Sequence, residues 1–228
     1  ATWKAVLEKA GWWRMLEKEK RELKQNEQGF FELDLSKLPI NDLKPLKGMP
    51  LAKLLLHSSN IRDLSPLKGM PLKDLSLDDW QNLKSIAPLK GMPLKNLCLS
   101  RCQNVKDLTP LQGMPLQDLS LYGCPQFNDR DLAVLRGMPL TVLQLDSTQA
   151  TDLRNFKDMP LITLHLGGTK VKDLSPLKGK PLSNLGIGGT LVSDLGPLQG
   201  DAVERTEPRR MQAYQRSQRA QRDAGNVA

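Results

Sequence analysis

The chain has 228 residues, a net charge of +8 and an aromatic content of only 4%. This length suits one repeat domain with end pieces, and the scarcity of aromatic side chains argues against a surface that binds nucleic acid by base stacking. The basic charge leaves non-specific attraction to nucleic acid open, although no motif supports it. No stretch approaches the roughly 20 consecutive apolar residues that cross a membrane, so we expect no membrane span.

Residues 1–29 predict a helical cap, with a helix from residue 2 to about residue 25. Thr2 is a plausible helix cap, and Gly11 is a candidate break. One stripe at helical spacing is apolar: Trp3, Val6, Leu7, Ala10 and Trp13. This stripe suits a helix that covers the open end of the segment that follows, and a partner-binding helix is the alternative.

Residues 30–200 contain one pattern eight times. Each copy reads L-x-x-L-x-L with a small residue three places later, and successive copies are 21 to 24 residues apart. The first apolar residues of the copies are Phe30, Leu51, Leu72, Leu94, Leu116, Leu140, Leu161 and Leu182. Side chains alternate between apolar and other types after Leu51, which predicts a short strand. Ser65 as a cap with Pro66 at the first position then predicts a 3₁₀ turn, and Gly69 ends it.

One copy cannot bury its own leucines, so the copies must stack and cover one another. The prediction is an α/β fold: a right-handed, gently curved solenoid with eight parallel strands on its concave face. Short 3₁₀ or helical turns would line the convex face. A fuller helical turn is expected in the longest copy, around Asp131, Leu132 and Leu135.

The repeats resemble a known family. L-x-x-L-x-L followed by D-L-x-P-L resembles the leucine-rich repeat of bacterial internalin-like proteins. The variants LKGMPLKDLSL and LRGMPLTVLQL are similar to repeats of planctomycete-type bacterial proteins. The resemblance implies a solenoid that binds proteins without catalysis. Relatives of this type often join such repeats to a kinase or another effector domain, which implies a sensor or docking segment.

The position after each strand, often asparagine in this family, is variable here. It reads Leu38, Ser59, Trp80, Cys102, Cys124, Thr148, Thr169 and Thr190. Ser, Thr and Cys can bond the turn backbone, whereas Leu38 and Trp80 cannot do so in the same way, so we expect irregularity near Trp80. Three cysteines do not form a disulfide framework, which indicates buried thiols and a cytoplasmic location.

A second polar column precedes the turns. It reads Asp42, Asp63, Ser85, Asp107, Asp131, Asp152, Asp173 and Asp194. Aligned carboxylates suggest a metal site, but each stands just before a helical turn. We therefore expect them to accept backbone N–H groups rather than to bind a cation.

The outward strand positions offer no enzyme constellation. His57 and Cys98 lie two strands apart, roughly 9.6 Å at the usual strand spacing, which is too far for a nucleophile and its base. No histidine neighbours a cysteine as a zinc site requires. The sequence therefore predicts no catalytic residue, no metal, no cofactor and no small-molecule substrate.

The same positions predict a protein partner. The outward face is rich in acids, while lysines gather in the turns at Lys44, Lys47, Lys68, Lys90 and Lys178, so we expect an acidic concave face and a basic convex side. Ordinary solubility is the alternative explanation. The candidate partner-binding residues are Glu32, Asp34, Leu55, His57, Asp74, Asp78, Asp118, Tyr122, Val142, Asp146 and His165.

Residues 201–228 depart from the repeat. They contain few large apolar residues and several arginines, which predicts a basic tail that is helical or disordered. An alternative function follows from the two ends. The chain would be a structural subunit that docks into a larger complex through its Trp-rich helix and its Arg-rich tail.

Overall fold

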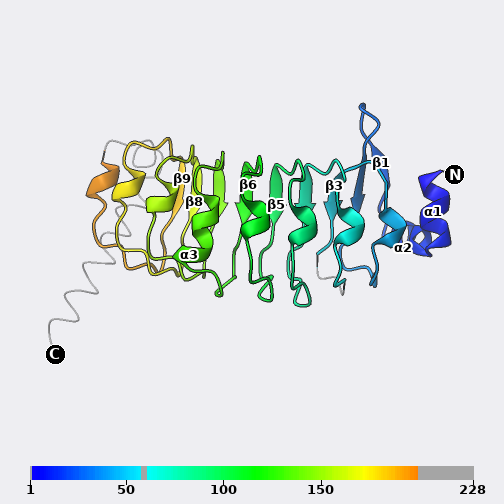
Figure 1. Ribbon diagram of the computed structural model, residues 1–228, viewed down its shortest axis with the longest axis horizontal. Helices are drawn as coiled ribbons and strands as arrows, with labels where there is room; N and C mark the ends of the chain where they lie inside the picture. The colour runs from blue at the N-terminus through cyan, green and yellow to red at the C-terminus, as the bar shows by residue number, and fades with distance from the viewer. Residues whose placement is uncertain (1, 58–60, 200–228) are drawn as a thin grey trace.

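A computed structural model describes residues 2–57 and 61–199 as an elongated array, with two helices at one end (Figure 1). The chain begins with α1 (Trp3–Lys9), α2 (Trp12–Lys18) and β1 (Lys24–Gln25). The repeats then supply β2 (Phe31–Asp34), β3 (Leu51–Leu55), β4 (Asp74–Ser76), β5 (Asn96–Cys98), β6 (Asp118–Ser120), β7 (Val142–Gln144), β8 (Thr163–His165) and β9 (Asn184–Gly186). No helix in these ranges is long and apolar enough to cross a membrane.

The strands form one sheet in chain order, and β2 to β9 are the eight predicted parallel strands. From β3 onward, equivalent residues of successive repeats pair without a shift, as Leu54, Leu75 and Leu97 do. At the first junction Phe31, not Phe30, pairs with Leu51, because the register shifts beside Glu32. The sheet stays open and uncurled, and we call its outward side the strand face (Figure 1).

A 3₁₀ turn follows each strand from β2 to β9 and packs against the turns of adjacent repeats, as the spacing predicted. The turns are η1 (Lys44–Leu46), η2 (Ser65–Leu67), η3 (Ala87–Leu89), η4 (Thr109–Leu111), η5 (Ala133–Leu135), η6 (Arg154–Phe156), η7 (Ser175–Leu177) and η8 (Gly196–Leu198). α3 (Asp129–Leu132) precedes η5, which confirms the fuller helical turn in the longest repeat. The prediction that Ser65 caps the turn η2 is wrong, because Leu64 occupies the N-cap position.

The amino-terminal segment differs from its prediction as one helix. Gly11 adopts φ +75° and separates α1 from α2, and Thr2 makes no side-chain capping bond. Because the break rotates the second helix, Trp12 enters the core, while Trp13 lies half-buried beside it. The helix ends at Lys18 rather than near residue 25. The chain then turns, and β1 pairs antiparallel with β2 as a ninth strand that the sequence did not predict.

The interior is a continuous stack of leucines. In the central strands Leu97 and Leu119 are almost or fully buried, and equivalent leucines of the other strands line up with them. A methionine from the turn before most strands is also buried. The core therefore runs the length of the array, and each repeat covers the next.

In the column of residues after the strands, Trp80 was expected not to bond the backbone as Ser, Thr and Cys do, and this expectation is wrong. Its indole N–H donates to the carbonyl oxygen of Leu56 in the preceding repeat, and the side chain is fully buried. The Cys102 and Cys124 thiols reach back to the preceding repeat in the same way, donating to the carbonyls of Leu77 and Leu99 at 3.0 and 3.2 Å. Ser59 lies outside the described residues.

The threonines of this column bond differently. Thr148, Thr169 and Thr190 each donate at 2.7 Å to the carbonyl three residues earlier, within their own repeat. Residues of this column therefore donate hydrogen bonds to carbonyl groups near the strand ends, either within their own repeat or in the preceding repeat. The bulky indole of Trp80 makes the second kind of bond.

The cysteines are free thiols, and Cys102 and Cys124 are buried, as predicted. Burial raises the pKa of the Cys102 thiol to about 12 and that of Cys124 to about 11. Both side chains therefore stay protonated and unreactive at neutral pH.

The structure confirms the interpretation of the aspartate column except at Asp131, which lies inside α3 and accepts the backbone N–H of Asn128 at 3.0 Å. Asp63, Asp107 and Asp173 each accept the backbone N–H of the residue two places later, at 2.8 Å, where the 3₁₀ turn begins. Ser85 does the same for Ala87 with its hydroxyl. The described residues contain no group of three or more His, Cys, Asp or Glu that could hold a metal ion.

Candidate functional site on the strand face

Three rows of outward side chains cross the strand face. The first row runs Glu32, Lys53, Asp74, Asn96, Asp118, Val142, Thr163 and Asn184. The second runs Asp34, Leu55, Ser76, Cys98, Ser120, Gln144, His165 and Gly186. The third follows two residues later, with Ser36, His57, Asp78, Ser100, Tyr122 and Asp146 among its members. All eleven predicted partner-binding residues therefore occupy these rows.

Three of the six acids are already engaged. The Arg21 guanidinium lies 3.2 Å from the Asp34 carboxylate, and Arg101 lies 3.3 Å from Asp78. Asp146 accepts the backbone N–H of Gly167 at 3.0 Å. The face is consequently less acidic than the sequence count suggested, because two arginines from outside the strands neutralise part of it.

The other three acids lie in the first row and form no ion pair with a described residue. Asp74 accepts only a side-chain N–H from Asn96. Asp118 is partly buried, and desolvation raises the pKa of its carboxyl group. Glu32 lies at the amino-terminal end of the same row, beside Lys53. The three acids that form no ion pair therefore lie along one row from β2 to β6, with Lys53 between Glu32 and Asp74.

Two hollows follow that line. One, of about 330 Å³, lies where the segment before β1 approaches the first strands and is lined by Lys20, Arg21, Glu22, Lys24, Glu32, Leu33, Asp34, Lys53 and Leu55. The other, of about 170 Å³, is lined by Lys53, Leu55, Asp74, Leu75, Ser76, Asn96, Leu97, Cys98 and Asp118. They share Lys53 and Leu55, so together they form an interrupted groove with lining residues from the six strands β1 to β6.

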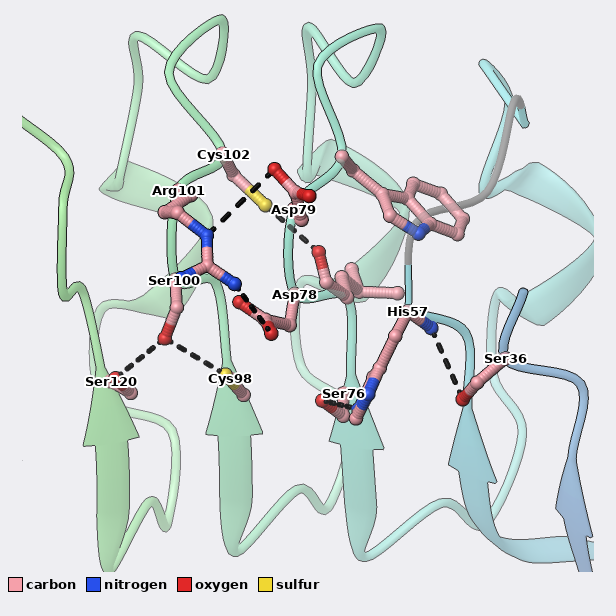
Figure 2. A network of polar contacts seen from close by, with 12 residues as sticks. Ser36, His57, Ser76, Asp78, Asp79, Cys98, Ser100, Arg101, Cys102 and Ser120 are labelled. Atoms are coloured by element: carbon pink, nitrogen blue, oxygen red, sulfur yellow. Dashed lines mark hydrogen bonds and ion pairs between the residues drawn. The ribbon is translucent and has the colours of Figure 1, made fainter.

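A polar network crosses the carboxyl ends of β2 to β6 (Figure 2). The Ser36 hydroxyl accepts the backbone N–H of His57 at 3.3 Å, and a ring nitrogen of His57 lies 2.6 Å from the Ser76 hydroxyl. Further along, the Ser100 hydroxyl contacts the Cys98 thiol at 3.1 Å and the Ser120 hydroxyl at 2.8 Å. These lateral contacts hold the side chains of neighbouring repeats in place.

The Ser76–His57 contact was not foreseen from the sequence, in which the two residues are 19 positions apart. Its length is that of a nucleophile and base, but no described residue bonds the other ring nitrogen to set the tautomer. The Cys98 thiol contacts a serine rather than a histidine. The arrangement therefore has one contact of a catalytic triad without the third group.

Leu55 lies in the groove, whereas the candidates Tyr122, Val142 and His165 lie toward the middle and far end of the face. Tyr122 is 45% exposed and Val142 is half-buried. His165 packs beside Gly186, where a Cβ atom would come within 3.3 Å of its ring. These residues stand apart from the acidic groove, so the structure does not gather all eleven candidates into one cluster.

Four basic residues of the strand face were missed: Lys20, Arg21 and Lys24 line the first hollow, and Arg101 pairs with Asp78 in the third row. Arg21 falls within the predicted helix, and nothing in its sequence context signals that its side chain reaches Asp34 and the carbonyl of Ser36. Arg101 follows a strand, and its contact with Asp78 depends on the stacking of β4 beside β5.

No family model and no curated protein matches the chain. Among solved structures, internalin C2 from Listeria monocytogenes str. 4b F2365 is similar, with a TM-score of 0.67, 27% identity, and coverage of 76% of this chain and 77% of that one. The internalin inlF from the same strain gives a TM-score of 0.59 and 25% identity. That match covers 73% of this chain and 56% of inlF, so the chain spans just over half of that relative.

The fold is that of an internalin-like leucine-rich-repeat solenoid. The internalin-like match covers about three quarters of the chain, in agreement with the extent of the predicted repeats. It supports a role in protein–protein interaction in general and names neither a partner nor a binding face for this chain.

Proposed function

We propose that the chain is a non-catalytic protein-interaction scaffold that binds a partner on its strand face. The observation that carries the proposal is the row of unneutralised carboxylates beside the shared hollows, with Asp74 and Asp118 above a floor that includes Leu55. A partner that presents a lysine or arginine together with apolar side chains fits this chemistry. The likeness to internalin solenoids supports an interaction role at a coarser level.

The partly buried Asp118 carboxylate gives the strongest argument. Burial makes its charge unfavourable, as the raised pKa indicates, and no described residue compensates it. A cationic side chain from a partner would compensate this charge in a site that is already partly dehydrated. Asp118 therefore has the properties of a binding residue that reduces the stability of the free protein.

Replacing Asp74 and Asp118 with asparagine tests the proposal. Partners captured on the immobilised chain are identified by mass spectrometry, and the affinity of the purified partner is then measured. The double variant should bind roughly tenfold or more weakly, with a smaller salt dependence, because it loses the charged contacts. Asp158→Asn with Glu19→Gln, two exposed acids off the strand face, is the control and should leave affinity unchanged.

A measurement of stability distinguishes the loss of charged contacts with the partner from misfolding of the variant. Asp118→Asn should raise the free energy of unfolding at neutral pH, because the folded-state pKa of Asp118 is raised and its charged form is disfavoured. The gain should disappear below about pH 3.9, where the carboxyl group is protonated in both states. Equal affinity of the double variant and the wild type would exclude this surface.

The alternative, an assembly subunit, depends on the two ends of the chain. Trp12 is buried against the repeats, and Trp3 and Trp13 pack partly against the same core, which favours a capping role. The tail at 201–228 lies outside the described residues. A subunit should lose assembly when residues 201–228 are deleted, whereas a strand-face scaffold should keep its partner.

Two finer parts of the proposal depend on sequence features. The GMPL turns, which resemble those of planctomycete-type proteins, support a docking segment joined to an effector. The three free thiols support a cytoplasmic location, since oxidising compartments favour disulfides.

A further inference from the structure

Charge is segregated on the solenoid edge at the amino-terminal ends of the strands. This edge comprises the segments from each 3₁₀ turn to the following strand: 44–53, 65–73, 87–95, 109–117, 133–141, 154–162 and 175–183. They contain twelve lysines and arginines, and Asp158 is their single acidic residue. The aspartates of the capping column precede the turns. Cations also occur elsewhere on the repeats, but on this edge they have almost no acidic residues beside them.

Six of these cations form a regular row. They occupy the residue that ends successive 3₁₀ turns and are all exposed: Lys47, Lys68, Lys90, Arg136, Lys157 and Lys178. We call them the basic rim. None of the six forms an ion pair with a described residue. Gln112 interrupts the row at the end of η4.

Such a row is electrostatically unfavourable in the free protein. Neighbouring turns such as η1 and η2 contact each other, so Lys47 and Lys68 bring like charges onto adjacent repeats, and like charges repel. Gln112 occupies the same position with the same turn geometry, so the turn does not require a cation. The rim therefore has a charge that the fold itself does not need.

Apolar surface lies between the cations. A furrow of about 740 Å³ between the first two turns is bounded by Lys47 and Lys68 and includes Pro50, Pro66 and Pro71. The same Gly-Met-Pro sequence follows Lys90 and Arg136, so the apolar residues that border this furrow recur beside later cations. A ligand for this edge would present negative charges at regular intervals with small apolar groups between them.

We propose that the basic rim binds an extended acidic polypeptide segment in which Asp or Glu alternates with apolar residues. A flat anionic membrane fits less well, because the β1–β2 hairpin projects past the amino-terminal ends of the neighbouring strands (Figure 1). Duplex nucleic acid fits less well because its backbone winds away from a straight row. Single strands lack a stacking platform, since Phe156, the sole aromatic residue of these segments, is fully buried.

Fluorescence polarisation at low salt tests the rim on the full chain. The probe is a labelled peptide of repeated Glu-Pro-Leu units, which proline keeps extended. Replacing Lys68, Lys90 and Arg136 with glutamine should weaken binding by roughly 2- to 5-fold per cation, as exposed ion pairs of modest strength imply. Gln112→Lys fills the gap and should tighten binding by a similar factor, which a misfolded variant could not do.

The matched control removes three exposed lysines from the opposite edge: Lys84, Lys170 and Lys172. This variant has the same net charge as the rim variant and should bind almost as the wild type does. Equal losses in both variants would mean that net charge alone attracts the peptide and would overturn the proposal. Asp74→Asn with Asp118→Asn should leave peptide binding intact, so failure of the strand-face proposal and failure of this one are distinguishable.

Three further probes test which kind of molecule binds the basic rim. A Glu-Pro-Ser peptide should bind more weakly than Glu-Pro-Leu, and equal affinity would overturn the role of the furrows. An oligouridylate and phosphatidylserine vesicles should bind more weakly than the Glu-Pro-Leu peptide. If either binds more tightly and loses that binding in the rim variant, the acidic polypeptide is the wrong occupant.

Discussion

At the scale of single residues, the aspartate column shows how a carboxylate caps six of the eight 3₁₀ turns. Asp107 accepts both the backbone N–H and the hydroxyl of Thr109, at 2.8 and 2.9 Å. These bonds favour the ionised form and lower the pKa of Asp107 below its usual value. The residue thus stabilises the fold only while it is charged, which makes its contribution dependent on pH.

Asp107→Ala should lower the free energy of unfolding at neutral pH by about 0.5–1 kcal/mol, in the range of exposed helix caps. Because the folded-state pKa is depressed, the contribution is complete above the unfolded value of about 3.9 and is lost as pH falls through the folded value. Denaturant melts of wild type and variant at several pH values should therefore converge in acid.

The chain itself supplies the control for this variant. Ser85 caps η3 through its hydroxyl, so Asp107→Ser should keep the backbone bond and lose the pH dependence. A stability difference between wild type and Asp107→Ala that is the same at pH 2 and pH 7 would contradict the assigned role of the carboxylate.

At the scale of elements, the two short helices and the β1–β2 hairpin close the amino-terminal end of the core. Leu7 from α1 and Trp12 and Leu16 from α2 are buried with the first repeats. Trp13 instead donates its indole N–H to Glu17 at 2.7 Å and lies beneath the Lys4 ammonium. The capping role therefore falls to Trp12 rather than to Trp13.

Trp12→Ala should destabilise the protein by roughly 3–5 kcal/mol, as truncation of a buried aromatic side chain does. Trp13→Ala, in the same helix, should cost clearly less because its ring is partly exposed. Hydrogen exchange should show the Trp12 effect first in β2 and β3. If Trp13→Ala proved the more damaging, the observed packing of α2 would be wrong.

At the scale of the whole molecule, each repeat contacts mainly its neighbours, so stability is close to a sum of repeat and interface contributions. Leu119 is fully buried in β6 and is paired on both sides, with Leu97 and Leu143. A defect there affects two interfaces. A defect in β9, the last strand of the described sheet, affects one interface within that sheet.

Leu119→Ala should therefore cost roughly 2–5 kcal/mol. Hydrogen-exchange protection should fall most in β5 to β7 and least in β2 and β9. Leu185→Ala in β9 is the matched substitution and should cost less, with its effect confined to the last repeats. A uniform loss of protection along the array would show that the solenoid unfolds as one unit instead.

Features that repeat were predictable from the sequence. Eight strands, their leucine core, the 3₁₀ turns and the capping role of aspartates such as Asp63 all follow from a period that each copy must satisfy locally. The strand-face candidates were also placed correctly, because alternation along a strand determines which side chains point outward. The charge state of that face was not predictable in the same way.

Only the tertiary structure decided the features that occur once. β1 has two residues and no periodic signal, and the choice of Trp12 over Trp13 depends on the turn at Gly11. Whether an acid is neutralised depends on long arginine side chains that cross between elements, as Arg21 does to Asp34. The repeat length is a local property that the sequence displays directly, whereas such pairings depend on distances that exist only after the repeats have stacked.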